Sequence, residues 1–295
     1  MKKIFNGTTL MLLTCMIWGS NFVFAKMALS GTSPYMYNFL RYGIGSIILI
    51  IIFKDHLKNL NRDLIKDSLL LAIFTFISST LFTLALKELP ASEVGAYRAI
   101  QVPLIPFIAH FILKEKLSLK NVFAAIMAFI GLVILNYTGS GFNMSYSVLL
   151  VLLSALFYSL YIVFTERDVN KEDAMALAIV QSSLIAIFGL IAVVSRGELS
   201  TISSITNYSL IGILTSAFLV NSLSYVTQCM AQQRISASDT GIISSTSPLF
   251  SILLAVILLG ETLTINQAIG SAIIISSVMV ANSHFEFHRK HIKHH

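Results

Sequence analysis

The chain has 295 residues, of which 56% are hydrophobic and only 12% are charged, and its mean hydropathy is +0.81. A soluble domain carries about twice that share of charged residues, so the composition excludes an ordinary water-soluble protein and indicates an integral membrane protein. The net charge of +6 comes without a basic stripe or an aromatic-interleaved patch, so we attribute it to membrane topology and expect no nucleic-acid partner.

Apolar runs of about 18 to 23 residues predict ten transmembrane helices, because about 20 residues are needed to cross roughly 30 Å of hydrocarbon. The first run follows Lys2 and Lys3 and could be a signal peptide, but its length and the similar runs after it favour a retained helix. The predicted spans are 8–28, 34–53, 67–87, 91–113, 119–137, 146–165, 174–195, 208–230, 237–259 and 264–283.

Lysine and arginine residues gather on one side of these spans. With a cytoplasmic N-terminus, 15 of the 20 lie in inner loops or near the termini, and the outer loops hold only Lys26, Lys87 and Arg196. This asymmetry predicts a multi-pass protein of the bacterial inner (plasma) membrane with both termini cytoplasmic. The histidine-rich tail is expected to be a solvated end, with metal binding as the weaker alternative.

Two segments of the sequence repeat each other. A shift of 146 residues aligns 91–95 (Ala-Ser-Glu-Val-Gly) with 237–241 (Ala-Ser-Asp-Thr-Gly), and the same shift matches Glu115 with Glu261. We interpret this as a duplication into a first five-helix repeat at 1–140 and a second repeat with a short cytoplasmic tail at 141–295. Because five is odd, the predicted fold is all-α, with ten transmembrane helices in two inverted five-helix repeats.

These segments also resemble a known family. The segment 18–22 (Trp-Gly-Ser-Asn-Phe), Lys26, Arg41 and the two repeated blocks look like the EamA branch of the drug/metabolite transporter superfamily. The resemblance covers nearly the whole chain and implies a transporter, since relatives export amino acids and other metabolites and some import them. The second repeat departs from the pattern, with Phe-Tyr-Ser-Leu at 157–160, so the two repeats are expected to contribute unequally to a site.

Arg98 is the strongest candidate for a substrate-binding residue. Ionisable side chains inside a span cost a few kcal/mol each and usually face a cavity or a partner. Arg98 lies about 10 Å along the fourth span, too deep to reach the outer headgroups easily. Its guanidinium suits a carboxylate or phosphate, and Tyr97 and Gln101 could add hydrogen bonds. The alternative is that Arg98 only pairs with Glu93 or another carboxylate.

Three further ionisable residues in the spans are assigned to gating or proton coupling. Glu93, at the outer end of the fourth span, and Asp239, at the inner end of the ninth, could instead be charges that stabilise helix N-termini. Arg41 lies about two turns into the second span. It could belong to an outer vestibule or extend to the headgroups.

Prolines interrupt the fourth and ninth spans at similar depths. Pro103 and Pro106 lie in the fourth span, and Pro248 in the ninth corresponds to position 102 of the first repeat. Paired interruptions often mark a transporter's binding site because the freed carbonyl groups can contact substrate. Ser244 and Ser247 are therefore predicted to line the same space, although helix packing by small residues would give a similar pattern.

Aromatic and amide residues are expected to complete the cavity. We assign Trp18, Asn21, Tyr158 and Tyr161 to substrate binding, because such residues suit a zwitterionic or aromatic solute better than a bare ion. Anchoring at the membrane interface is the alternative for the tyrosines. Further polar residues inside spans are Gln181, Asn221, Tyr225 and Gln228.

Small residues at four-residue spacing would let helices approach closely. Such pairs are Ala124 and Ala128 in the fifth span and Ala268 and Ala272 in the tenth. These two spans could pack together away from the transport path or form the interface of a homodimer.

No enzyme or channel motif accompanies these features. The sequence has no H-E-x-x-H, no aspartate pair for magnesium, no G-x-S-x-G and no Walker motif, so we expect neither an enzyme nor a cofactor or metal. No span has the continuous polar lining of a channel.

We therefore expect a secondary-active transmembrane transporter that, on the family resemblance, exports amino acids or related small metabolites by alternating access. Import of a small polar metabolite or an amine is the alternative, ahead of a membrane scaffold, sensor or enzyme. The expected partners are a small-molecule substrate, protons as a coupling ion and the lipid bilayer.

Overall fold

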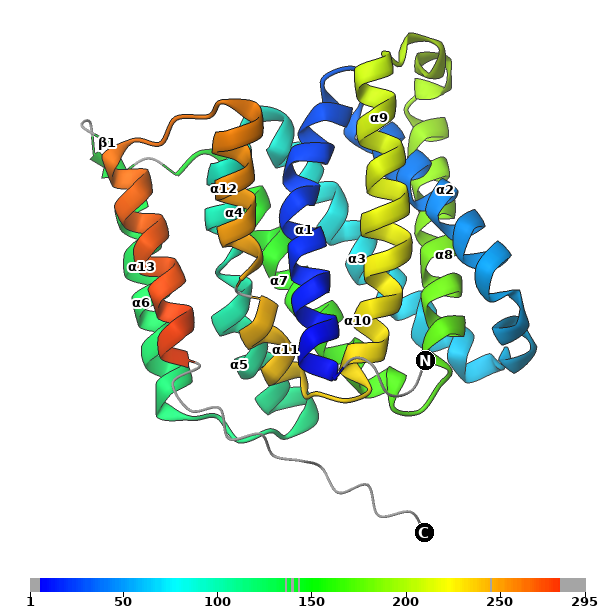
Figure 1. The fold of residues 1–295 in the computed structure, drawn as a ribbon, viewed down its shortest axis with the longest axis horizontal. Helices are drawn as coiled ribbons and strands as arrows, with labels where there is room; N and C mark the ends of the chain where they lie inside the picture. Colours follow the sequence, from blue (N-terminus) through cyan, green and yellow to red (C-terminus); the bar gives the residue numbers. More distant parts are fainter. Residues whose placement is uncertain (1–5, 136, 139–140, 143, 245, 282–295) are drawn as a thin grey trace.

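The structure is a computed structural model that describes residues 6–135, 137–138, 141–142, 144–244 and 246–281 as a bundle of helices (Figure 1). The N-terminal part contains α1 (Gly7–Leu29), α2 (Pro34–Phe53), the 3-10 helix η1 (Lys54–Asn59), α3 (Arg62–Glu88), α4 (Ala91–Arg98), α5 (Gln101–Leu113) and α6 (Leu119–Leu135). Two residues each of β1 (Tyr137–Thr138) and β2 (Gly141–Phe142) pair antiparallel after α6.

The C-terminal part contains α7 (Tyr146–Val169), α8 (Ala174–Ser195), the 3-10 helix η2 (Glu198–Ser204), α9 (Asn207–Thr215), the π-helix η3 (Ser216–Leu223), α10 (Ser224–Gln232), α11 (Ala237–Ser244), α12 (Ser247–Leu259) and α13 (Ile265–Ala281). Lys2, Lys3 and the histidine-rich tail, which contribute to the predicted orientation, lie outside the described residues.

Seven stretches of the described residues are long and apolar enough to cross a membrane, judged by length and composition. They are Gly7–Leu29, Pro34–Asn59, Arg62–Glu88, Ala91–Leu113, Tyr146–Val169, Ala174–Ser195 and Asn207–Gln232. Shorter apolar helices, Leu119–Leu135, Leu249–Leu259 and Ile265–Ser277, occupy the places of the other three expected spans. The helices α6 and α13 have 17 residues each, so each covers only about 26 Å.

The helix α1 runs through the middle of the bundle and packs mainly against α9, α10 and α12 (Figure 1). The helix α2 packs against α8, and α3 packs against α7 and α8. The interrupted helices lie side by side, with α4 on α12 and α5 on α11. The start of α1 and the end of α13 lie at the same end of the bundle (Figure 1).

The helices α6 and α13 pair at one edge of the bundle, which is one of the two arrangements that the sequence allows (Figure 1). A Cβ atom on Gly131 would lie 2.9 Å from the carbonyl oxygen of Gly270, and one on Gly270 would lie 2.7 Å from that of Gly131. Of the four alanines expected at helix contacts, Ala124 and Ala128 are buried, and Ala268 and Ala272 are exposed. The close approach on α13 is therefore made by its glycine and not by the predicted alanines.

Three helices of the C-terminal part repeat three of the N-terminal part. The bounds of α4, α5 and α6 become those of α11, α12 and α13 when 146 is added to each residue number. The residues that follow α5 and α12, Lys114 and Gly260, both have left-handed backbones, with φ of 58° and 66°. The offset found in the sequence thus also relates the helices and their ends.

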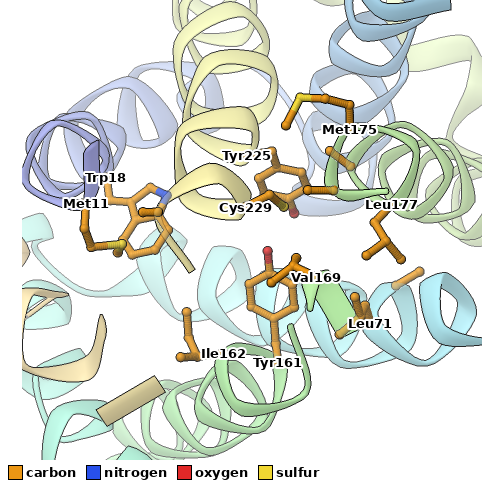
Figure 2. Packing of buried hydrophobic residues seen from close by; sticks show 14 of the residues in the cluster. Met11, Trp18, Leu71, Tyr161, Ile162, Val169, Met175, Leu177, Tyr225 and Cys229 are labelled. Carbon is orange, nitrogen blue, oxygen red and sulfur yellow. The ribbon is translucent and has the colours of Figure 1, made fainter. Parts of the chain in front are cut away.

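Buried aromatic residues join the two parts of the chain in a common core. The rings of Tyr161 on α7 and Tyr225 on α10 face each other, with 6.4 Å between their centroids (Figure 2). Trp18 on α1 meets the ring of Tyr158 edge-on at 5.5 Å, and its indole N–H donates to Ser224 Oγ at 3.1 Å. Contacts between α1, α7 and α10 therefore fix the centre of the bundle.

Asp173 caps α8 and ties it to η1. Its carboxylate accepts hydrogen bonds from the backbone N–H of Ala176 at 3.1 Å and from Asn59 Nδ2 at 2.6 Å. His56 Nδ1 lies 2.9 Å from the same carboxylate. Burial alone would raise the pKa of Asp173, but the hydrogen bonds from His56, Ala176 and Asn59 hold that pKa below its usual value.

Candidate functional site

A cavity of about 70 Å³ lies among helices of both parts of the chain, enough for a few water molecules or a comparably small solute. Its lining is aromatic and polar, and its charged members are two arginines. The lining residues are Trp18, Asn21, Phe22, Arg41, Tyr42, Thr75, Ser78, Ser79, Phe82, Arg98, Gln101, Tyr158, Val220, Tyr225 and Ser247.

Arg41 is almost completely buried, with 4% of its surface exposed. Its guanidinium donates to Ser79 Oγ at 2.9 Å, to Tyr37 Oη at 3.2 Å and to Asn21 Oδ1 at 3.4 Å. The guanidinium carbon lies 4.4 Å from the ring centroid of Tyr42, within the range of a cation–π contact. Arg41 therefore faces the interior of the bundle, and its expected alternative of extending to the headgroups is wrong.

Arg98 ends α4 and reaches the same cavity. Its Nη1 donates to Ser154 Oγ at 2.5 Å and its Nη2 donates to Ser78 Oγ at 3.4 Å. The guanidinium carbon lies 4.7 Å from the ring centroid of Tyr158 and 5.0 Å from that of Phe82. Hydroxyl groups and aromatic rings on α3 and α7 therefore hold this side chain in place.

Neither guanidinium has a carboxylate partner within the part of the chain that the structure describes. The ion pairs there join acidic residues to other cations. Glu93 accepts a hydrogen bond from Gln267 Nε2 on α13 instead. Pairing of Arg98 with Glu93, the alternative to substrate binding, is therefore wrong, and the partners of both arginines are uncharged.

The interruption between α4 and α5 places Gln101 at the cavity. Pro103 lacks an N–H, and its ring conflicts with the carbonyl group of Ala99, four residues earlier. The chain instead makes tight turns there, with Ile100 N–H donating to Tyr97 O at 3.2 Å. Gln101 is the first residue of α5 and lines the cavity.

The second interruption has the same form. The helix α11 ends at Ser244, and α12 begins at Ser247 with Pro248 in its first turn. Ser247 lines the cavity, as Gln101 does at the start of α5. Both predicted interruptions are present, while Pro106 lies inside the continuous helix α5.

A family comparison identifies the kind of protein to which this cavity belongs. The model of the EamA-like transporter family matches the chain twice, over residues 5–137 and 145–283. The chain belongs to the EamA-like transporter family. The match extends over nearly the whole sequence, which confirms the resemblance noted from the sequence motifs.

Relatives of this EamA-like chain have similar length. An uncharacterized transporter of Archaeoglobus fulgidus is 28% identical over 92% of this chain and 83% of its own length. The uncharacterized transporter YvbV of Bacillus subtilis is 25% identical over 96% of this chain and 94% of its own. A crystal structure with 18% identity superposes with a TM-score of 0.72 over 94% of this chain and 96% of the other, which shows a shared fold.

The cavity of this EamA-like chain brings together seven of the twelve residues predicted from the sequence. They are Trp18, Asn21, Arg41, Arg98, Gln101, Tyr158 and Ser247. The sequence favours a gating role for Arg41, but the structure places it beside the candidates for substrate binding.

Three residues predicted to bind substrate do not line the cavity. Tyr161 is buried and donates to Gln228 Oε1 at 3.0 Å. Tyr97 is buried in the second hydrophobic cluster, which includes residues of α4 and α12. Ser244 is also buried, and its hydroxyl donates to the carbonyl of Thr240 at 2.6 Å. In this conformation these three side chains are buried outside the cavity.

The two acidic candidates also lie away from the cavity. Asp239 is exposed near the start of α11. Glu93 is half-buried in the first turn of α4, where Gln267 of α13 donates to it and Glu261 lies within Coulombic range. Neither contacts Arg41 or Arg98, so any gating or coupling role would be exerted at the ends of the interrupted helices.

Glu261, in the loop between α12 and α13, caps α4 from the other part of the chain. Its carboxylate accepts hydrogen bonds from the backbone N–H groups of Ala91 and Ser92, at 2.8 Å each, and from Ser92 Oγ at 2.6 Å. Pro90, which precedes α4, has no side chain that could cap it. Lys26 lies within Coulombic range of Glu261, so the cap is also a charged contact between the parts.

The polar face of α3 was not predicted from the sequence. Thr75, Ser78 and Ser79 line the cavity, and their spacing of three and four residues places them on one helix face. That spacing, in an otherwise apolar span, is the signal that could have identified them. Tyr42, next to Arg41, was also missed, and Tyr225 was noted as polar but not assigned to the site.

Three buried polar atoms on the cavity wall have no hydrogen-bond partner among the described residues. They are Nε of Arg41, Oγ1 of Thr75 and Oε1 of Gln101. An unpaired buried polar group costs about 1–3 kcal/mol, so these atoms favour a small polar molecule that can pair with them. The arrangement provides both donors and acceptors around a central space.

Proposed function

We propose that this chain is a secondary-active transporter that binds a small polar metabolite in the central cavity and carries it across the membrane by alternating access. The observation that carries the proposal is the cavity, where the buried Arg41 and the half-buried Arg98 meet the first residues of two interrupted helices. Among the described residues, neither arginine has a carboxylate partner. Membership of a transporter family supports the proposal.

The proposal includes two inverted five-helix repeats, residues 1–140 and 141–295. It is supported by the offset of 146 residues that relates α4–α6 to α11–α13, and by the two separate family matches. In such an arrangement α6, α13 and the interrupted pair α11–α12 would act as spans besides the seven longer ones. The repeats can then tilt against each other, so that a central site opens to either side in turn.

We further propose export of amino acids or related small metabolites, with protons as the coupling ion and Glu93 and Asp239 at the gates. Export rests on the family resemblance. Glu261 caps the first turn of α4, and Glu93 lies in that turn near Glu261 and Gln267. This position supports a gating role for Glu93.

Transport is tested with purified protein in proteoliposomes. Uptake and efflux of labelled amino acids, amines and phosphorylated metabolites are measured with a pH gradient imposed or abolished. We expect at least one solute to move, and Arg98→Ala to slow it at least about tenfold, as removal of a charge-assisted hydrogen bond would. The matched control is Arg62→Ala, an exposed arginine at the start of α3.

If no solute in the panel moves, the transporter proposal fails. If Arg98→Ala transports as well as wild type, the cavity is not the site.

Orientation is tested by labelling introduced cysteines. The native Cys15 and Cys229 are buried, so they should react slowly. With both termini in the cytoplasm of a bacterium, a membrane-impermeant maleimide should label Ser200→Cys in η2 in intact cells, and label Lys58→Cys in η1 only after the cells are opened. The reverse pattern would contradict the proposed orientation.

A further inference from the structure

The cavity carries two positive charges that its own wall does not balance. Among the described residues, its lining contains Arg41 and Arg98 but neither aspartate nor glutamate. The two guanidinium groups lie within Coulombic range of each other. Like charges repel strongly in a low-dielectric interior, and a buried charge normally has a partner of opposite sign.

The existing contacts position the arginines without neutralising them. The Nη atoms of Arg98 donate to the hydroxyl groups of Ser154 and Ser78. The rings of Tyr158 and Phe82 contact the same guanidinium, and the ring of Tyr42 contacts that of Arg41. These aromatic faces are therefore already used by arginine, which leaves less π surface to receive a substrate ammonium group.

The cavity wall also contains hydrogen-bond donors that have no partner among the described residues. Arg41 is 4% exposed, yet its Nε has no hydrogen-bond partner among the described residues. The hydroxyl of Thr75, on the same wall, has none either. Carboxylate and phosphate oxygens are acceptors and match guanidinium and hydroxyl donors.

We propose that the substrate of this site is a small organic anion, whose carboxylate or phosphate group binds to Arg41 and Arg98. The inference rests on the proposed function, since it takes the cavity as the transport site. It narrows that function, because an amino acid or an amine would bring an ammonium group beside two guanidinium groups. The described lining has no carboxylate that could bind this ammonium group. Amino acids are then poorer substrates than hydroxy acids of the same size.

Matched pairs of solutes test the proposal with the full chain purified in detergent. Dissociation constants are measured by calorimetry for malate and aspartate, which differ by a hydroxyl in place of an ammonium group, and for glycerol 3-phosphate and glycerol. The two anions distinguish carboxylate from phosphate. We expect malate or glycerol 3-phosphate to bind at least about tenfold more tightly than its partner solute.

Variants locate the binding. Arg41→Gln and Arg98→Gln should each raise the dissociation constant of the better anion at least about tenfold. Arg98→Lys, which keeps the charge, should raise the dissociation constant less. This lysine variant serves as the test if a glutamine variant does not elute as a single species. Arg62→Gln, on the exposed start of α3, is the control and should bind like wild type.

The proposal is overturned if aspartate or a diamine such as putrescine binds as tightly as malate and glycerol 3-phosphate, or if neither anion binds. It is also overturned if both glutamine variants bind the anion like wild type.

Counterflow in proteoliposomes separates this proposal from the transport proposal. Binding of an anion that never crosses the membrane would refute transport and leave the ligand class intact. Movement of amino acids or amines without any preference for anions would refute the ligand class and leave transport intact.

Discussion

Replacement of Glu261 by alanine removes the cap that the loop after α12 provides to α4. The carboxylate accepts hydrogen bonds from two backbone N–H groups and one hydroxyl group. The donors belong to Ala91 and Ser92, which are 0% and 2% exposed, so water cannot readily replace the carboxylate. A helix cap contributes about 0.5–2 kcal/mol, and a second buried donor left unpaired costs about 1–3 kcal/mol. We expect the free energy of unfolding to fall by about 1.5–5 kcal/mol.

The loss can be measured by unfolding in mixed micelles with increasing SDS, followed by the fluorescence of Trp18, the one tryptophan in the sequence. The matched control is Glu88→Ala. Glu88 is exposed at the end of α3 and, like Glu261, interacts electrostatically with Lys26. Only Glu261 of these two residues caps α4. We expect the control to change the free energy of unfolding by less than about 0.5 kcal/mol. Equal destabilisation by the two variants would refute the capping argument.

Gly131→Leu should reduce the free energy of unfolding by about 1–3 kcal/mol in the same assay, because any side chain at this position meets the backbone of Gly270. An unchanged free energy of unfolding would show that α6 and α13 can separate freely. Pro103→Ala should slow proteoliposome transport at least about fivefold without lowering thermal stability, because it restores an N–H at the interruption between α4 and α5; unaltered transport would contradict a role for the break. Asp173→Asn should destabilise the protein at pH 7 but not at very low pH. The folded pKa of Asp173 is depressed, so its contribution is complete above the unfolded value of about 3.9 and disappears as the pH falls through the folded value. Unfolding midpoints measured against pH should converge for the two proteins, and a constant difference would contradict this.

The helices could be predicted from the sequence because the bilayer demands long apolar runs, and every predicted span contains helix in the structure. Their ends depend on local chemistry that hydropathy ignores. The third span is expected at 67–87 but begins at Arg62, since Asn61 Oδ1 accepts from the N–H of Leu64 at 2.7 Å and starts the helix earlier. The π-helix η3, which packs against α2, could not be predicted, because hydropathy does not distinguish a π-helix from an α-helix.

The arginines of the site could be predicted because burial of a charge in a span is costly and therefore marks a site. The neutral residues that surround the arginines could not be predicted in the same way. Tyr158 and Tyr161 lie on the same helix only three residues apart, yet Tyr158 lines the cavity, while Tyr161 bonds to Gln228 on α10. That difference depends on how α7 rotates against α10, and one sequence does not determine the rotation.

The central position of α1 bears on how the protein is made. Its main partners are α9, α10 and α12, and about 220 residues separate its end from the start of α12. At roughly 5–20 residues per second, a ribosome needs about 10–40 s to synthesise that stretch. During this time the indole N–H of Trp18 must find a temporary partner within the insertion machinery or the lipid headgroups, because Ser224, which accepts its hydrogen bond, lies on α10. The helix α1 thus completes its packing only after most of the helices that follow it have been made.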